Sequence, residues 1–407
     1  MYDTRVFSMA LQGISAQTGV YRYTSELLAA LAIRNDLRLH LLICPYQPLD
    51  DLLLIHEYFS SNTIFCSLKR IGARFTLFLA GISKFVPCLN TKLTRWLCRL
   101  LDKHILAAWA FYSYSPVLHL PYFAIPQSIF RRQWKLVSTI HDLVPLIHPE
   151  WFDGVVLGYL KNWLRSVLSD QQILILVSSE STSADVYDFV PAFDSSRLHK
   201  VPLAASRCFR PLDLQEVLCF RDKSHIPRDA KVILTTCADN LSKNFSTIAA
   251  AFAALKNSSA LKNLRLVVAG INRSDLDSLN FFIQREGIES DVSILGHLSD
   301  YELALAYNSA DCFLYLSLYE GFGLSVLEAL SCGCPTVCSS TSSIPEVVAD
   351  AALLVQPNDF RAAANALYSF LADPGLCFQY RQRALERSSL FSWENTAAES
   401  VRVYSRA

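Results

Sequence analysis

The sequence predicts an α/β protein with two domains, each built on a parallel sheet. Residues 6–11, 23–33 and 37–44 have the patterns of a strand, a helix and a second strand. This βαβ order implies parallel strands joined by a right-handed crossover. A second series of alternating strands and helices begins near Lys231. The 407 residues are enough for two or three domains with sizeable cores.

The remaining strands are short, nearly continuous apolar runs, as expected for strands buried on both faces. The predicted strands of the two halves are 117–121, 134–140 and 173–177, then 232–236, 264–269, 292–295 and 312–316. A helix over 300–308 precedes the last of them. Residues 199–211 form the predicted connection between the halves.

Composition and charge exclude several classes of protein. Hydrophobic residues make up 52% and charged residues 18%, which is typical of a globular chain. Basic and acidic residues both number 37, and this zero net charge argues against nucleic acid as the main partner. The twelve cysteines are scattered, and no secretory signal is recognisable, so we expect a reducing cytoplasm. Cys332, Cys334 and Cys338 fall in an apolar stretch and are interpreted as buried thiols rather than a metal site.

The most informative stretch runs from the strand at 312–316 into an apolar helix. Between them lie Glu320, Gly321 and Gly323. Glu328 follows Glu320 at a spacing of about two helical turns. A strand, a glycine turn and a helix together aim backbone N–H groups and the positive end of a helix dipole at one point, which suits phosphate. Carboxylates beside it accept hydrogen bonds from hydroxyls. The pattern therefore predicts a site for a nucleotide sugar.

Residues 317–352 also resemble the E-x7-E signature region of the retaining glycosyltransferases of family 4, or group 1. The resemblance implies the GT-B fold, in which two Rossmann-like, doubly wound parallel-sheet domains face each other across a cleft. It implies an acceptor-binding domain over 1–205, a nucleotide-sugar-binding domain over 212–388 and a last helix within 389–407 that packs back on the first domain. Hinges are expected near 202–211 and before that helix.

The resemblance also implies roles for individual residues. Glu320 would contact the donor sugar and Glu328 the ribose hydroxyls, while the backbone from Gly321 to Leu324 would offer N–H groups. Lys243 would stabilise the leaving diphosphate. The complete set of expected donor-binding residues is Gly19, Lys243, Asn244, Glu320, Gly321, Phe322, Gly323, Leu324 and Glu328.

The acceptor side is expected around a His-Asp pair. Residues 139–146 are similar to the T-I-H-D-L-x-P-L motif of a mannosyltransferase-like subset of the family. His141 would therefore be catalytic together with Glu320 and Lys243, either moving a proton or holding the donor sugar. Asp142 and His119 are further candidates for the acceptor side. The family needs no metal, and no D-x-D arrangement implies one; no cofactor beyond the donor substrate is expected.

Three positions depart from the family pattern. Tyr21 stands where a second glycine is common after Gly19, Ser242 replaces an arginine before Lys243, and Cys237 replaces another arginine. These departures keep a catalytically impaired nucleotide-sugar-binding protein open as the alternative. A nucleotide-sugar epimerase of the same architecture is disfavoured by the E-x7-E run, and a dinucleotide oxidoreductase by the missing G-x-G-x-x-G.

Residues 66–105 contain eight basic residues and one acidic residue among aromatic and aliphatic ones. This composition suits either the inner face of a membrane or two ordinary amphipathic helices with a solvated basic side. The family resemblance as a whole implies a retaining hexosyltransferase, with mannose as the first guess for the sugar. The acceptor would be a saccharide or lipid-linked saccharide in surface polysaccharide or O-antigen biosynthesis.

Overall fold

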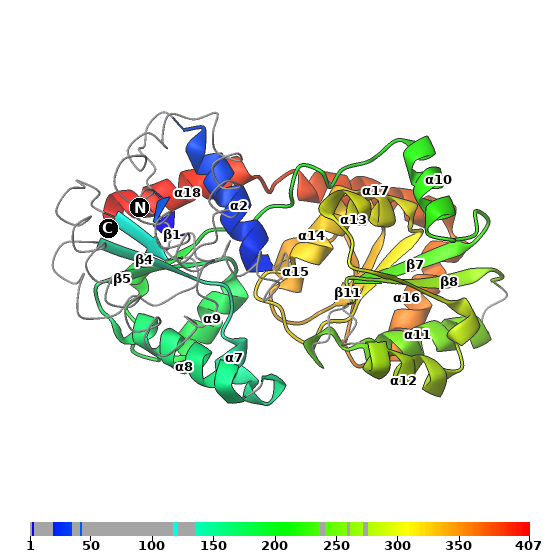
Figure 1. Ribbon diagram of the computed structural model, residues 1–407, viewed down its shortest axis with the longest axis horizontal. Helices are drawn as coiled ribbons and strands as arrows, with labels where there is room; N and C mark the ends of the chain where they lie inside the picture. The colour runs from blue at the N-terminus through cyan, green and yellow to red at the C-terminus, as the bar shows by residue number, and fades with distance from the viewer. Residues whose placement is uncertain are drawn as a thin grey trace, which may run out of the picture.

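A computed structural model shows two parallel sheets connected by a short passage (Figure 1). It describes residues 2–3, 19–34, 41–42, 117–120, 135–152, 154–236, 241–258, 261–271 and 276–407. The predicted strand over 6–11, the basic segment 66–105 and Cys237 lie outside these residues. The predicted α/β class with two doubly wound parallel sheets is confirmed.

The first sheet has the order β2-β1-β3-β4-β5-β6, and every pairing in it is parallel. Its strands are β1 (Tyr2–Asp3), β2 (Leu41–Leu42), β3 (Val117–Leu120), β4 (Lys135–Ile140), β5 (Ile173–Val177) and β6 (Leu198–Lys200). Its helices are α2 (Gly19–Ala32), α7 (Val144–Ile147), η3 (Pro149–Trp151), α8 (Gly154–Ser169), α9 (Glu180–Phe189) and η4 (Ser195–Arg197). Helix α2 begins four residues before the predicted start at Tyr23.

The second sheet has the order β12-β11-β10-β7-β8-β9 and is also entirely parallel. Its strands are β7 (Lys231–Thr236), β8 (Leu264–Ala269), β9 (Val292–Gly296), β10 (Cys312–Tyr315), β11 (Thr336–Ser339) and β12 (Leu353–Val355). Its helices are α10 (Leu214–Lys223), η5 (Leu241–Lys243), α11 (Phe245–Ser258), α12 (Leu276–Glu286), η7 (Glu289–Asp291), α13 (Asp300–Ser309), α14 (Leu324–Ser331), α15 (Ile344–Val348), α16 (Phe360–Ala372) and α17 (Pro374–Ser388).

Both faces of the second sheet are buried because its apolar side chains alternate between two cores. Val232 and Leu234 of β7 pack with α10, α13 and α14, whereas Ile233 between them packs with α11, α12 and α16. Figure 1 shows these two sets of helices on opposite sides of the strands. Burial on both faces explains why the strands are continuous apolar runs in the sequence.

Helix α18 (Trp393–Arg406) returns from the end of the second half to the first sheet. Val403 packs with Val137, Leu176 and Val201, and Trp393 lies 6.3 Å from Tyr23, centroid to centroid. The apolar face of α18 thus covers the side of the first sheet opposite α8, beside α2 (Figure 1). The domain bounds at 205, 212 and 388 stay predictions.

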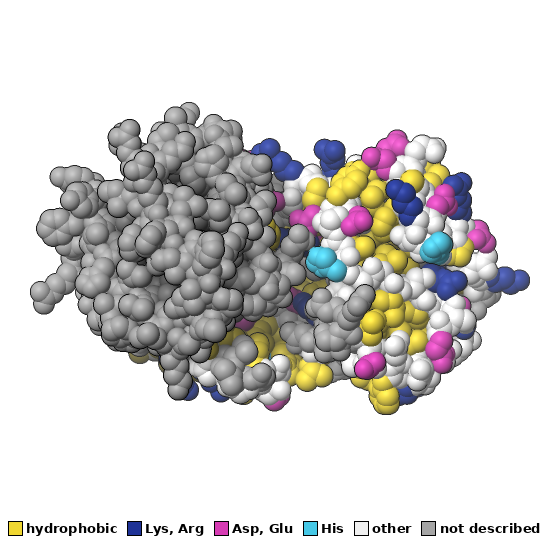
Figure 2. Space-filling model, viewed as in Figure 1, with side chains coloured by type: hydrophobic (Ala, Val, Ile, Leu, Met, Phe, Trp, Pro, Cys, Tyr) yellow, Lys and Arg dark blue, Asp and Glu magenta, His cyan; other side chains and the backbone are white. Residues whose placement is uncertain are grey.

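On the face seen in Figure 2, acidic and basic side chains are interspersed over the half that carries the second sheet. This distribution agrees with the balanced totals of 37 and 37. Among the described helices, none is both long and apolar enough to cross a membrane.

Candidate functional site

The site lies where the second sheet reverses its strand order. From β7 the chain adds β8 and β9 on one side, then returns to add β10, β11 and β12 on the other. Ligands of open α/β sheets bind beyond the carboxyl ends of the two strands at such a switch point. Lys243 follows β7 and Glu320 follows β10, so the topology brings together two residues that are 77 positions apart.

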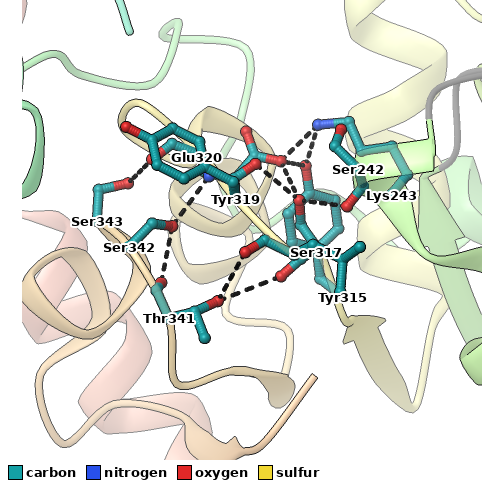
Figure 3. Close-up of polar contacts among 10 residues, drawn as sticks. Ser242, Lys243, Tyr315, Ser317, Tyr319, Glu320, Thr341, Ser342 and Ser343 are labelled. Carbon is teal, nitrogen blue, oxygen red and sulfur yellow. Dashed lines mark hydrogen bonds and ion pairs between the residues drawn. The ribbon is translucent and has the colours of Figure 1, made fainter. Parts of the chain in front are cut away.

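Lys243 and Glu320 form a partly buried ion pair, with Nζ 2.5 Å from Oε1 (Figure 3). The Tyr315 hydroxyl lies 2.7 Å from both groups, and the Ser317 hydroxyl donates to the same carboxylate oxygen at 2.7 Å. Burial by itself disfavours the charged carboxylate, but Lys243 and these hydrogen bonds outweigh burial and lower the pKa of Glu320. In the same way, Glu320 and Tyr315 outweigh burial and raise the pKa of Lys243. Both groups are therefore charged at neutral pH.

The backbone of Glu320 is held by the turn that follows β11 (Figure 3). The Ser342 hydroxyl accepts a hydrogen bond from the Glu320 N–H at 2.9 Å, and the Ser343 hydroxyl donates to the Glu320 carbonyl at 2.9 Å. Ser342 adopts a φ of 50°, in the left-handed region. Glu320 is thus held in place through both its side chain and its main chain.

Helix α14 begins immediately after residues 317–323, which contain Glu320 and are called the glutamate turn. Gly323 occupies its N-cap with a φ of 96°, a conformation that favours glycine, and no side chain caps the helix there. The first N–H groups of α14 consequently point out of the helix end without a side-chain acceptor from the cap residue. Such groups are suited to bind the oxygens of a phosphate.

Gly321 contacts the first domain directly. Its carbonyl oxygen accepts hydrogen bonds from the hydroxyls of Ser178, Ser179 and Thr182, at 3.2, 2.6 and 3.1 Å. These donors lie at the end of β5 and in the first turn of α9. The residues that follow the strands of both sheets therefore meet at this glycine.

Glu328 lies in α14 and is 1% exposed. Its Oε1 atom lies 2.5 Å from Nη1 of Arg22 in α2, and its Oε2 atom accepts a long hydrogen bond of 3.4 Å from the Tyr307 hydroxyl. The sequence pattern predicts no role for Arg22, which directly follows Tyr21. Only the approach of α2 to α14 reveals the contact.

The two candidate histidines lie in different surroundings. His141 follows β4, and its ring meets that of Tyr23 edge-on at 4.8 Å. His119 is buried in β3, with its ring nitrogens 2.7 Å from the hydroxyls of Tyr404 and Thr139. Burial lowers the pKa of His119 to about 3, so this ring is neutral. These two contacts of His119 connect α18 to the first sheet. A role of His119 at the acceptor side stays a prediction.

Asp142 lies beside His141, close to the glutamate turn. Its Oδ1 atom accepts a hydrogen bond of 3.0 Å from the Val144 N–H, which begins α7. Burial raises its pKa to about 6, and the charge of Glu320 acts in the same direction. The protonation of Asp142 in the first domain therefore depends in part on the charge of Glu320 in the second domain.

The other predicted donor residues have mainly structural contacts. The Asn244 amide donates to the carbonyls of Leu316 and Pro357, at 3.2 and 2.8 Å, and so joins η5 to β10. Phe322 is buried, and Leu324 is partly buried, in the apolar cluster that contains α2 and α18. Gly19 is the first residue of α2. Among the described residues, no group of three or more His, Cys, Asp or Glu side chains could hold a metal ion.

The fold is that of the GT-B glycosyltransferases. Two solved structures show the same fold at low identity: WaaG, a glycosyltransferase involved in lipopolysaccharide biosynthesis, and the Anabaena protein HepE in complex with UDP and glucose. Both have a TM-score of 0.67. WaaG is 13% identical, with 100% of this chain and 99% of that chain covered, and HepE is 15% identical, with 96% of each covered.

The chain belongs to the group 1 glycosyltransferase family. The family model described as "Glycosyl transferases group 1" matches residues 219–387. The O-antigen chain mannosyltransferase B of Escherichia coli is 30% identical over 298 residues, which cover 73% of this chain and 76% of that protein. The expected family is confirmed.

Proposed function

We propose that this protein is a retaining hexosyltransferase that uses a nucleoside-diphosphate sugar. The observation that carries the proposal is the fixed Lys243–Glu320 pair at the switch point, followed by the open N-terminus of α14. A cation and a helix N-terminus are suited to bind the diphosphate of such a donor, and a carboxylate is suited to accept hydrogen bonds from its sugar hydroxyls. The family membership supports transfer of a sugar rather than another reaction of a nucleotide.

The chemistry follows from where charge develops. The bond between the anomeric carbon and the diphosphate oxygen breaks, and a new bond to an acceptor hydroxyl oxygen forms on the same face of the sugar. The acceptor proton passes to the departing diphosphate oxygen. Negative charge grows on the diphosphate, so Lys243 and the α14 N–H groups stabilise the transition state more than the bound donor. Glu320 orients the sugar through its hydroxyls, and His141 lines the acceptor side.

For the substrates, we propose mannose as the donor sugar and a saccharide or lipid-linked saccharide as the acceptor. The similarity to an O-antigen mannosyltransferase supports this choice, as does the T-I-H-D-L segment at 139–143. The acceptor belongs to surface polysaccharide or O-antigen biosynthesis in this proposal.

A second candidate function is nucleotide-sugar binding without efficient transfer. Cys237 and Ser242 stand where the family pattern leads us to expect arginines, so in this proposal Lys243 supplies the diphosphate charge with fewer cationic neighbours. Weaker stabilisation of the leaving group would slow the reaction without preventing donor binding. Binding and turnover must therefore be measured separately.

The experiment is a thermal-shift series with ADP, CDP, GDP, UDP, dTDP, GDP-mannose and UDP-glucose, followed by a donor-turnover assay. A ligand at about 100 times its Kd stabilises the folded protein by about 2.7 kcal/mol. We expect one nucleotide and its sugar to raise the Tm of the wild type, and to raise that of Glu328→Gln by a clearly smaller amount. Glu216→Gln, at an exposed glutamate of α10, is the control and should respond like the wild type.

Each outcome decides between the candidates. A shift followed by turnover supports the transferase, whereas a shift without turnover, across saccharide and lipid-linked acceptors, favours the binding protein. No shift with any of the seven compounds in a folded protein would overturn both.

A further inference from the structure

Glu328 is a buried carboxylate that depends on a partner from the other domain. It is 1% exposed, and it lies on the face of α14 that packs against α2 and α13. An uncompensated charge in such a place is strongly disfavoured. The cation that pairs with it, Arg22, comes from the first turns of α2, which is 306 positions earlier in the sequence.

Arg22 holds two acidic residues at once. Its Nη1 atom donates to Glu328 Oε1 at 2.5 Å, while Nε and Nη2 donate to Asp300 Oδ1 at 3.1 and 2.6 Å. Asp300 begins α13, so the guanidinium joins one helix of the first domain to two helices of the second. A planar fork with several donors can bridge two carboxylates, which the single ammonium group of lysine cannot do in the same geometry.

The guanidinium is itself enclosed. The Arg22 side chain is 18% exposed, and its Cζ atom lies 5.6 Å from the centroid of the Phe209 ring, in the passage between the domains. Solvent screening is weak for a pair in this position, so its electrostatic effect is larger than that of a surface pair. Arg22 is therefore a fixed charge rather than a mobile surface side chain.

The charge of Glu328 is finely balanced. Burial raises its pKa to about 7, Arg22 opposes this increase, and Asp300 adds to it. The titratable groups that face Glu328 from α2, α13, the interdomain passage and α14 itself are Arg22, Asp300, Tyr307, Cys208 and Cys332. Arg22 is the positive charge among them, so without it the protonated form would prevail at neutral pH.

We propose that Arg22 is a positioning residue of the donor site: from across the domain boundary, it holds the Glu328 carboxylate as a charged acceptor for the hydroxyls of the nucleotide. The inference rests on the proposed function, because it assigns Glu328 to that nucleotide. An ionised carboxylate can accept several hydroxyl hydrogen bonds, whereas a protonated one uses an oxygen as a donor. Seating of α2 on α14 thus sets the affinity of the second domain for the donor.

The test measures the Kd of the nucleoside diphosphate that gives the largest thermal shift, by calorimetry between pH 6.5 and 9. We expect Arg22→Gln to bind the nucleotide about tenfold or more weakly than the wild type at pH 7. The reason is that the nucleotide hydroxyls lose a hydrogen bond to the charged Glu328 carboxylate. The ratio of the two Kd values should fall as the pH rises, because high pH restores the charge of Glu328. Arg22→Lys should recover part of the affinity.

Two further variants separate positioning from a general structural effect. In the Glu328→Gln background, adding Arg22→Gln should cause little additional loss, because contacting residues that act together are not additive. Arg207→Gln removes an exposed guanidinium that pairs with Glu394 and should leave the Kd unchanged. If Arg22→Gln does not fold, Arg22→Lys and its pH profile carry the test.

Absence of binding to the wild type would overturn the proposed function rather than this inference alone. The inference is overturned if the wild type binds and Arg22→Gln binds equally well or more tightly at pH 7. It is also overturned if the Kd ratio is independent of pH, or if the loss is undiminished in the Glu328→Gln background.

Discussion

The backbone carbonyl of His141 abuts Gly321: a Cβ atom built on this glycine would lie 2.1 Å from the carbonyl oxygen. The T-I-H-D-L segment of the first domain and the glutamate turn of the second are thus in direct main-chain contact. The φ of Gly321 is not positive, so its close approach to another backbone, and not its own conformation, requires glycine here.

Gly321→Ala should therefore separate the two domains at the site. Because the clash is with backbone, the cost cannot be relieved by a side-chain rotation, and we expect a destabilisation of about 1–3 kcal/mol together with loss of donor turnover. Urea denaturation and the turnover assay measure the two effects. Gly158→Ala is the matched control, since nothing lies within 4 Å of its added Cβ on α8. Equal stability and turnover in both variants would show that the contact is unimportant.

In the proposed mechanism Lys243 is the cation beside the leaving group, and Lys243→Ala also leaves the partly buried Glu320 without its ion partner. We expect turnover to fall at least about 100-fold, as for loss of one preorganised electrostatic group. Initial rates at saturating donor measure this effect. Lys256→Ala, which breaks a surface pair with Asp291, should leave the rate unchanged. A Lys243→Ala enzyme with more than a tenth of the wild-type rate would exclude this role.

Glu346 joins the two domains by capping a helix across their boundary. Its carboxylate accepts hydrogen bonds from the Glu180 and Ser181 N–H groups, at 2.9 and 3.0 Å, at the start of α9. Glu346→Ala should cost about 1 kcal/mol and favour a more open arrangement, visible as a larger radius of gyration in solution scattering.

The control for this prediction is another cap with two N–H partners. Asp373 caps α17 within the second half of the chain, at the Gly375 and Leu376 N–H groups. Asp373→Ala should cost a similar free energy without changing the radius of gyration. An unchanged radius in Glu346→Ala would show that other contacts hold the domains together.

The raised pKa of Asp142 predicts that the free energy of unfolding depends on pH. Burial raises its pKa from 3.8 to about 6, so the folded state binds more protons than the unfolded state between these values. The free energy of unfolding should therefore fall as the pH rises from 4 to 6, by about 1–3 kcal/mol from this group. Asp142→Asn keeps the hydrogen bond from Val144 and should reduce the fall, as urea denaturation across this range would measure.

Asp194 provides a comparison of opposite sign. Hydrogen bonds from Ser196 lower its pKa, so its contribution to stability is present above the unfolded pKa and is lost as the pH falls. Asp194→Asn should therefore reduce the loss of stability in acid. An identical pH profile of Asp142→Asn and the wild type would refute the assignment for Asp142.

Much of the fold was predictable from the sequence because the central strands of the two sheets, among them β4, β5, β7, β8 and β10, are buried on both faces. Continuous apolar runs placed β8 at its observed bounds and β7 and β10 within one residue. The start of α2 was not predicted, because Gly19 and Tyr21 carry no capping signal and apolar periodicity begins only at later residues. The placement of Glu320, Gly323 and Glu328 on one turn and helix also followed from local order along the chain.

By itself, the sequence determined the family, the strand–turn–helix around Glu320 and the residue types able to bind a diphosphate sugar, because these depend on near neighbours. The tertiary structure alone decided which distant groups meet there. Lys243 reaches Glu320 because the sheet reverses between β7 and β10, and Arg22 reaches Glu328 because α18 and α2 pack together and bring α2 against α14. Such contacts depend on how helices and sheets pack, which no local spacing of residues encodes.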